Sequence, residues 1–264
     1  MTPPDGAIPE REALARLLDD VQSLLRDEAQ IFGGVFLPED PMPDRPTTPA
    51  VQTPPAEAMS LFGPAATPPP PAGEPWAAAA GLEELNGLIC SCLKCPLGHT
   101  RTKFVFGVGN PRATLMLVGE APGADEDLQG EPFVGRAGQL LNKILEAIGF
   151  RREEVYIANI LKCRPPNNRT PLPEEVELCL PYLRRQVELI QPKLILCLGL
   201  VAAQNLLGTR ESLGRLRGRV LRYGDTPVMV TYHPAALLRN PAWKRPAWED
   251  VQAARKLHDE RIAS

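Results

Sequence analysis

Apolar and polar residues follow two different rhythms over the last two-thirds of the chain. Four short apolar runs have the length of buried strands, and between them apolar residues return every three or four positions, as on one face of a helix. The runs predict strands over residues 114–119, 155–160, 193–199 and 227–232, and the periodic stretches predict helices over 138–148, 173–190, 200–207 and 247–262. This alternation predicts an α/β fold of three layers, α/β/α, around a central, mostly parallel four-stranded sheet.

The first 80 residues have a different pattern. Residues 9–30 repeat leucine and valine at helical spacing, which predicts an amphipathic helix, and residues 38–75 contain 13 prolines, too many for a packed core. We therefore expect an N-terminal helical appendage over 1–37, a disordered Pro-rich linker over 38–80, and a folded domain over 81–264. The helix is either a weakly packed appendage or a docking element for a protein partner.

The composition fits a folded domain, with 44% hydrophobic and 23% charged residues. The formal net charge is −3 at pH 7, but residues 1–80 hold 12 acidic and 4 basic side chains, whereas residues 81–264 hold 20 and 25. The basic excess of the second part is compatible with a phosphate-bearing partner. The polar N-terminus does not resemble a secretory signal, and the longest apolar run, residues 194–203, is too short to cross a bilayer, so we expect a cytoplasmic protein without membrane contact.

Polar residues gather where the predicted strands end. The small-residue loop GEAPGADED at 119–127 follows the first strand, Asn159 ends the second, and His233 follows the fourth. Carboxyl ends of parallel strands share one edge of a sheet, which is where such folds bind ligands. Each feature alone is common in turns, caps and structural contacts, but together they predict a pocket with an acidic loop, a carboxamide and an imidazole.

The cysteines indicate a second site. In a cytoplasmic chain stable disulfides are not expected. Cys92 and Cys95 form one close pair, and Cys163 and Cys179 form a second pair separated by 15 residues. Four thiolates at such spacings suit either a 4Fe–4S cluster or a structural zinc ion. Cys90 is a spare thiol that could be confused with Cys92.

Longer stretches at these positions resemble one known family. Residues 119–127, followed by GEPFVGRAG at 130–138, resemble the first motif of the family-four uracil-DNA glycosylases, IANILKCRPPNNR at 157–169 resembles their second segment, and HPAALLR at 233–239 resembles their last motif. The match covers roughly residues 83–264. It implies a monomeric uracil-DNA glycosylase that extrudes uracil from single- or double-stranded DNA and hydrolyses its N-glycosidic bond, leaving an abasic site in base excision repair.

The resemblance also implies roles for residues at the strand ends. Phe133 would stack on the uracil ring, and the Asn159 carboxamide would pair with uracil N3–H and O4. His233 would donate a hydrogen bond to the departing O2 as negative charge develops on the base. The loop after the first strand would contact the base from the other side through Gly119, Glu120, Ala121 and Gly123.

The activation of the attacking water stays open. Ala121 occupies the position at which family-one enzymes carry an aspartate, so no carboxylate can be carried over there. Glu120 and Glu126 are weaker catalytic candidates than Asn159 and His233. Glu126 could instead be a surface charge or a helix N-terminal acid.

Two further features concern DNA contact. In the superfamily that the chain resembles, a segment after the histidine enters the space left by the extruded nucleotide, and here it contains Leu237, Leu238 and Arg239. The alternative is an ordinary helix start with buried leucines. Five arginines between residues 210 and 222 are either a phosphate-contact surface or a solvated basic face.

The resemblance selects a 4Fe–4S cluster over zinc. Its ligands would be Cys92, Cys95, Cys163 and Cys179, and its role would be structural because cleavage of an N-glycosidic bond transfers no net electrons.

Two rival functions remain. X-type relatives bind uracil-DNA without turnover and carry a reactive histidine in an Arg-rich insert, but residues 164–170 contain no histidine, which favours turnover. A nucleic-acid-binding module without catalysis is the rival from another class.

Overall fold

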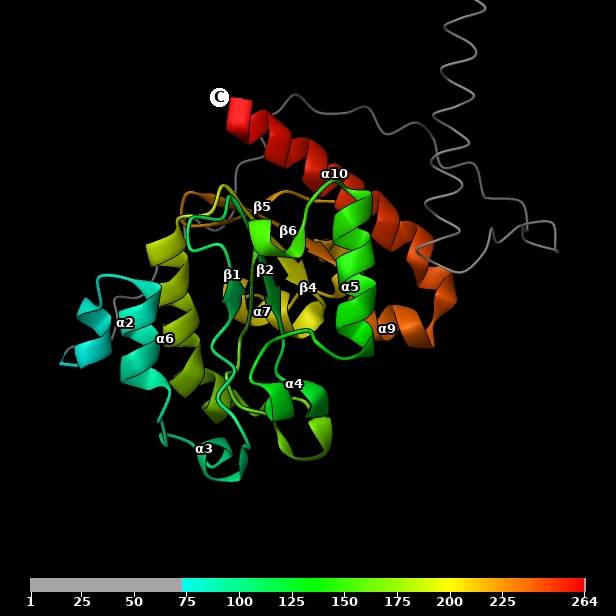
Figure 1. Cartoon of the computed structure of the whole chain (residues 1–264). Coiled ribbons are helices and arrows are strands. Elements are labelled where there is room, and N and C mark those ends of the chain that lie inside the picture. The colour runs from blue at the N-terminus through cyan, green and yellow to red at the C-terminus, as the bar shows by residue number, and fades with distance from the viewer. Residues whose placement is uncertain (1–72, 264) are drawn as a thin grey trace, which may run out of the picture. The chain divides into compact units, whose positions relative to one another are not determined.

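The computed structural model describes residues 73–263, which form layers of helices around a central sheet (Figure 1). The predicted N-terminal helix over 9–30, its docking role and most of the predicted linker lie outside the described residues. The sheet has the strand order β1-β3-β2-β4-β6-β5. Its four central strands run parallel and lie within one or two residues of the predicted runs: β2 (Leu115–Gly119), β3 (Tyr156–Asn159), β4 (Leu194–Leu198) and β6 (Thr226–Thr231).

The sheet is larger than predicted, with six strands rather than four. The additional strands are β1 (Val108–Gly109), antiparallel to β3, and β5 (Leu221–Tyr223), antiparallel to β6. Both lie at the edges of the sheet and span only two and three residues, and neither contains a buried residue. Such short, half-buried edge strands carry no apolar run, so the sequence pattern could not reveal them.

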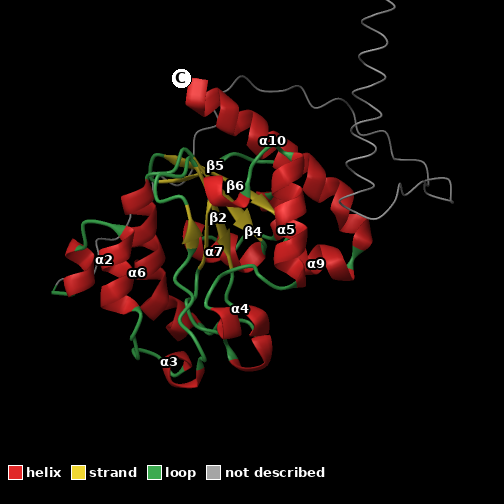
Figure 2. Cartoon of the chain, viewed as in Figure 1, coloured by secondary structure: helices red, strands yellow, loops and turns green. Residues whose placement is uncertain are grey.

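The four helices predicted after residue 81 are present, two of them with the predicted bounds. Figure 2 shows helices on both sides of the strands, which confirms the three-layer architecture. The longer helices are α2 (Leu82–Ile89), α5 (Arg136–Ala147), α6 (Pro173–Ile190), α7 (Leu200–Leu207) and α10 (Lys244–Ala263). Shorter ones are α3 (Leu97–Thr100), α4 (Ala124–Gln129), α8 (Leu213–Leu216), α9 (Pro234–Arg239) and the 3₁₀ turns η1 (Pro75–Ala78), η2 (Arg152–Glu154), η3 (Pro166–Asn168) and η4 (Pro241–Trp243). No helix within residues 73–263 is both long and apolar enough to cross a membrane.

Strands β2 and β4 are buried on both faces, which explains their continuous apolar sequences. Met116 and Val118 of β2 belong to a core that includes residues of α6 and α7. Leu117 between them faces the opposite side, in a small apolar gap lined by α5, α9 and α10. Helices therefore pack against both faces of the sheet, and this packing fixes the position of the carboxyl ends of its strands.

The folded region begins earlier than the predicted boundary at residue 81. Trp76 in η1 is buried and packs edge-on against Tyr182 of α6, with ring centroids 4.9 Å apart. The prediction of a linker over 38–80 is therefore wrong for its last residues. The linker was predicted from the density of proline, which is an average over many positions. Such an average does not reveal that one aromatic side chain, Trp76, packs on the domain.

Candidate active site

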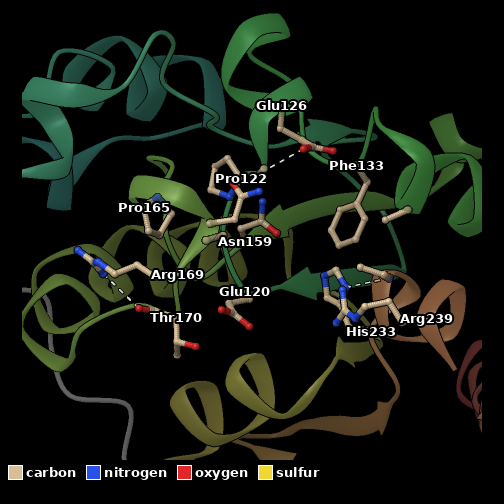
Figure 3. A pocket seen from close by; sticks show the side chains of 15 residues that line it. Glu120, Pro122, Glu126, Phe133, Asn159, Pro165, Arg169, Thr170, His233 and Arg239 are labelled. Atoms are coloured by element: carbon tan, nitrogen blue, oxygen red, sulfur yellow. Dashed lines mark hydrogen bonds between the residues drawn. The ribbon is translucent and has the colours of Figure 1, made fainter.

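A cavity of about 420 Å³ opens at the carboxyl ends of β2, β3 and β6 (Figure 3). Figure 3 shows Phe133 and His233 on one side, Arg169 and Thr170 on the other, and Glu120 between them. The structure thus brings together most of the residues selected from the sequence. Those that line the cavity are Glu120, Ala121, Gly123, Glu126, Phe133, Asn159, His233 and Arg239.

Gly119 leaves space for the recognition side chains. It is paired with Asn159 in the parallel ladder between β2 and β3. A Cβ atom at Gly119 would lie 2.7 Å from two ring carbons of Phe133 and would also collide with Asn159 Oδ1. A residue without a side chain is therefore needed here, because any larger one would displace the aromatic ring or the carboxamide.

The Asn159 carboxamide is buried but incompletely paired. The residue is only 2% exposed. Its Oδ1 is among the few buried side-chain atoms of residues 73–263 that have no hydrogen-bond partner. A buried acceptor without a partner costs about 1–3 kcal/mol, so this atom favours a ligand that brings an N–H group into the cavity.

Glu126 holds two loops together. Its carboxylate accepts hydrogen bonds from the backbone N–H groups of Gly123 at 3.1 Å, Val134 at 3.0 Å and Gly135 at 3.2 Å. The loop so fixed carries Phe133, whose backbone adopts a left-handed φ of 54°. Since these backbone donors already occupy the carboxylate, Glu126 is placed as a loop anchor rather than as a base.

Phe133 stands beside His233 at the wall of the cavity. The two ring centroids are 5.4 Å apart and the ring planes differ by 31°. Arg152 secures the preceding turn by donating from its guanidinium to the Pro132 carbonyl at 2.5 Å and to Asn142 Oδ1 at 3.1 Å. The aromatic face is therefore held in place from both ends of its loop.

The protonation state of His233 follows from its position as the N-cap of α9. Its Nδ1 accepts a hydrogen bond from the Ala235 N–H at 3.2 Å, which leaves the proton of the neutral ring on Nε2. Burial lowers the pKa of His233 to about 4, and the nearby Arg239 adds to this effect. At neutral pH the imidazole is uncharged and offers Nε2–H as a donor.

A buried ion pair supports the strand that leads to His233. Arg217 forms two contacts with Asp250, of 2.6 and 3.1 Å, and its guanidinium lies over the Tyr232 ring at 4.3 Å. The Thr231 hydroxyl also donates to Asp250 at 2.8 Å. Arg217 is thus engaged within the fold and is not part of a phosphate-contact surface.

The other arginines of this stretch differ among themselves. Arg219 pairs with Glu211 at 3.0 Å, and Arg222 donates to the Asp225 carbonyl at 3.1 Å. Arg210 and Arg215 are exposed. The five residues therefore do not form one surface of equivalent cations, which counts against the phosphate-contact interpretation.

Leu237, Leu238 and Arg239, the segment predicted to enter DNA as a wedge, differ in their burial. Leu237 is 1% exposed and lies in the apolar layer beneath α9, whereas Leu238 is 40% exposed. Arg239 is exposed and lines the cavity. Leu237 is therefore not available to enter DNA in this structure, because its side chain belongs to the core.

Glu120 is the other acidic side chain that lines the cavity, at the start of the loop after β2. Burial raises the pKa of its carboxyl group above the ordinary value. A carboxyl that is partly withdrawn from water in this way is a typical candidate for chemistry at a site.

The four cysteines of the two pairs lie within electrostatic reach of one another. Burial raises the pKa of the Cys179 thiol to about 12, and Cys163 and Cys95 add to the increase. Burial likewise raises the pKa of Cys163, where Cys95 and Cys92 contribute. Among residues 73–263, no three His, Cys, Asp or Glu side chains are grouped so that they could hold a metal ion.

Three of these four sulfurs accept a hydrogen bond from the rest of the domain. Tyr182 Oη donates to Cys92 Sγ, Arg101 Nη1 to Cys163 Sγ, and the Lys162 backbone N–H to Cys179 Sγ, each at 3.3 Å. Cys90 is exposed and donates instead to the Gly87 carbonyl. Three of the four sulfurs, those of Cys92, Cys163 and Cys179, therefore accept hydrogen bonds of the kind that the thiolate ligands of iron–sulfur clusters commonly accept.

Several residues near the site were missed in the sequence. Pro165, Asn168, Arg169 and Thr170 line the cavity although only a histidine was sought in their segment. Lys162 is completely buried, and burial lowers the pKa of its ammonium group to about 7. Its sequence signal was the mostly apolar stretch 155–161, which is interrupted only by Asn159 and runs directly into the lysine.

Comparison with known proteins defines the class to which this fold and cavity belong. Residues 106–252 match the family model described as the uracil DNA glycosylase superfamily. A type-4 uracil-DNA glycosylase of Archaeoglobus fulgidus is 52% identical over 168 residues, which are 61% of this chain and 84% of that protein. A type-4 uracil-DNA glycosylase of Pyrobaculum aerophilum is 48% identical over 178 residues, 64% of this chain and 91% of that protein.

The distinction between types is also clear. A type-5 uracil-DNA glycosylase of Thermus thermophilus is 32% identical over 147 residues, which are 48% of this chain and 67% of that protein. Its identity is well below that of the two type-4 proteins. The chain belongs to the type-4 uracil-DNA glycosylases, as the motifs at 119–138, 157–169 and 233–239 indicated.

Proposed function

We propose that this chain binds an extrahelical uracil of DNA in the cavity and hydrolyses its N-glycosidic bond. The observation that carries the proposal is the unpaired, buried Oδ1 of Asn159 in the same cavity as the neutral donor of His233. Uracil offers an N–H group to the first and a carbonyl oxygen to the second. The names of the type-4 relatives support the same activity.

Recognition rests on the pattern of donors and acceptors. Asn159 Oδ1 accepts from uracil N3–H, and its Nδ2 donates to O4. Cytosine presents an acceptor at N3 and a donor at the neighbouring exocyclic position, so both contacts would fail. Each mispaired buried group costs about 1–3 kcal/mol. Phe133 provides the aromatic face on which the base stacks.

Bond cleavage requires stabilisation of two developing charges. The C1′–N1 bond breaks with its electron pair passing to uracil, the water oxygen bonds to C1′ of the cationic sugar, and the proton that this water loses neutralises the released uracil anion. The Nε2–H of His233 donates to O2 of the departing base, and a donor fixed before reaction is most effective in such a buried site. Glu120 orients the water, since Glu126 is occupied by backbone donors.

The four cysteines would hold a 4Fe–4S cluster that joins the segment before the sheet to α6. When bound, the cluster supplies cross-linking of distant segments rather than electron transfer. Cys92 and Cys95 follow α2, whereas Cys163 follows β3 and Cys179 lies on α6. The chain's own contribution is the set of donors from Tyr182, Arg101 and Lys162 described above.

The direct test of the activity is release of free uracil from oligonucleotides. The full chain is mixed with matched single- and double-stranded DNA that contains uracil, cytosine or thymine at one position. We expect uracil release and an abasic site from the uracil DNA alone. Tight binding without release would favour a binding module, and absence of both would overturn the proposal.

Cluster content gives a further prediction. The purified full chain is expected to be brown, with broad visible absorption and four iron atoms per chain, because the buried thiolates of Cys163 and Cys179 need a metal partner to remain charged. Chelation or oxidation of the iron should lower the unfolding temperature. A colourless protein with stoichiometric zinc would contradict the iron–sulfur assignment.

The wedge gives a prediction that separates two adjacent leucines. Leu238→Ala is expected to slow uracil release from double-stranded DNA about tenfold while changing release from single-stranded DNA little, because only a duplex must be opened. Leu237→Ala should instead lower stability by about 2–5 kcal/mol, as for other buried leucines. Single-turnover rates and thermal unfolding distinguish the two. An equal loss on both DNA forms for Leu238→Ala would exclude a wedge role.

A further inference from the structure

Lys162 is a lysine in the interior of the fold that the reaction does not use. It follows β3 by three positions and is completely buried. A buried ammonium group is costly unless it is fully paired, and an apolar residue of similar size is often equally stable in its place. The presence of lysine here therefore calls for a role beyond filling space.

Its contacts join three parts of the molecule. Lys162 Nζ donates to the backbone carbonyl of Asn159 at 3.0 Å and to Gln186 Oε1 at 2.6 Å. Its backbone N–H donates to Cys179 Sγ at 3.3 Å. Gln186 is itself fixed, because its Nε2 donates to the Phe106 carbonyl at 3.0 Å and to the Tyr156 hydroxyl at 3.2 Å.

The Asn159 carbonyl lies where the ladder between β2 and β3 ends. The next two residues still hydrogen-bond to the end of β2 and to the loop after it, through Ile160 N–H to the Gly119 carbonyl and Leu161 N–H to the Glu120 carbonyl. Beyond them the chain turns toward Cys163. The side chain of Lys162 reaches back across this turn to the carbonyl of Asn159, so it fixes the peptide unit from which the carboxamide projects.

We infer that Lys162 is a positioning residue that ties Asn159 to the segment carrying Cys163 and Cys179. The inference rests on the proposed function, since it assigns a partner to the residue that reads uracil. Through this link, the four-cysteine group would influence recognition of the base as well as stability. Small displacements matter at such a site, since a shift of about 1 Å can slow a reaction about a hundredfold.

The test uses the full chain with Lys162→Met, which keeps the length of the side chain but donates no hydrogen bond. Iron per chain and visible absorption are expected to match the wild type. The single-turnover rate of uracil release should fall about a hundredfold, and affinity for free uracil should fall with it. Lys162→Gln, which retains an N–H donor, should recover part of the rate at the same iron content. Lys143→Met, at an exposed position of α5, is the control.

Two results would overturn the inference. One is a Lys162→Met rate within threefold of the wild type at full iron content. The other is a rate that falls only in proportion to lost iron, because Lys162 would then support the cluster and not Asn159. If Lys162→Met does not fold, Lys162→Gln is judged by the same criteria. A wild-type protein that releases no uracil would defeat the proposed function itself and is thereby distinguished from both results.

Discussion

Asn159→Ala is expected to slow single-turnover release of uracil about a hundredfold or more. The substitution removes the acceptor for N3–H and the donor to O4, and each tenfold loss of rate corresponds to about 1.4 kcal/mol of transition-state stabilisation. Loss of two buried hydrogen bonds accounts for an effect of this size. The measurement is a rapid-quench assay on double-stranded DNA with one uracil.

Two variants make the Asn159 result specific. Asn159→Asp keeps an acceptor for N3–H but places an anionic oxygen opposite O4, so uracil release should remain slow. Asn86→Ala, at a half-buried position of α2, should leave the rate unchanged. Asn159→Ala should unfold near the wild-type temperature, whereas Asn159→Asp should unfold at a lower one because it buries a carboxylate. Near-normal rates for Asn159→Ala would mean that the base is read elsewhere.

His233→Ala is expected to lower the single-turnover rate by about 10²–10³-fold, the usual effect of removing one preorganised donor to a developing anion. Binding of uracil DNA should change much less, because the donor acts mainly as charge develops on O2. The exposed His99 provides the matched control, and His99→Ala should be silent. A rate loss explained entirely by weaker DNA binding would contradict the assignment.

The depressed pKa of His233 predicts the pH dependence. In the folded protein the pKa is about 4, below the value of about 6.5 for an unfolded histidine. The unfolded chain therefore binds the extra proton first as the pH falls, so the stability contributed by neutral His233 is present above pH 6.5 and is lost as the pH falls through 4. The rate should follow, staying flat near neutrality and falling toward pH 4. His233→Gln should flatten the histidine part of the stability profile.

Most helices and strands could be predicted from the sequence, because a strand that is buried on both faces of the sheet has a continuous run of apolar residues. The apolar runs of β2, β3, β4 and β6 and the helical spacing of α6 and α7 are direct consequences of packing. The edge strands β1 and β5 were not accessible. They are held by backbone pairing with β3 and β6, and backbone pairing leaves no imprint on the side chains of two or three residues.

The residues of the site could be predicted from the sequence where the strand topology alone determines their position. Asn159 and His233 line the same cavity because parallel strands end at the same edge of the sheet, and that rule needs no side-chain detail. Glu126 and Leu237 could not be resolved in this way. Whether a carboxylate faces water or three backbone N–H groups, and whether a leucine faces DNA or the core, depends on the three-dimensional course of the loops. Lys162 was missed for the same reason, since its partners come from distant parts of the chain.

The most direct measurement is a crystal structure of the full chain with DNA containing 2′-deoxypseudouridine, whose carbon–carbon glycosidic bond resists hydrolysis. The account predicts an extrahelical base stacked on Phe133, with the base N–H within hydrogen-bond distance of Asn159 Oδ1 and the opposite carbonyl facing His233 Nε2. A base that stays within the duplex, or that enters the cavity without meeting either side chain, would contradict it.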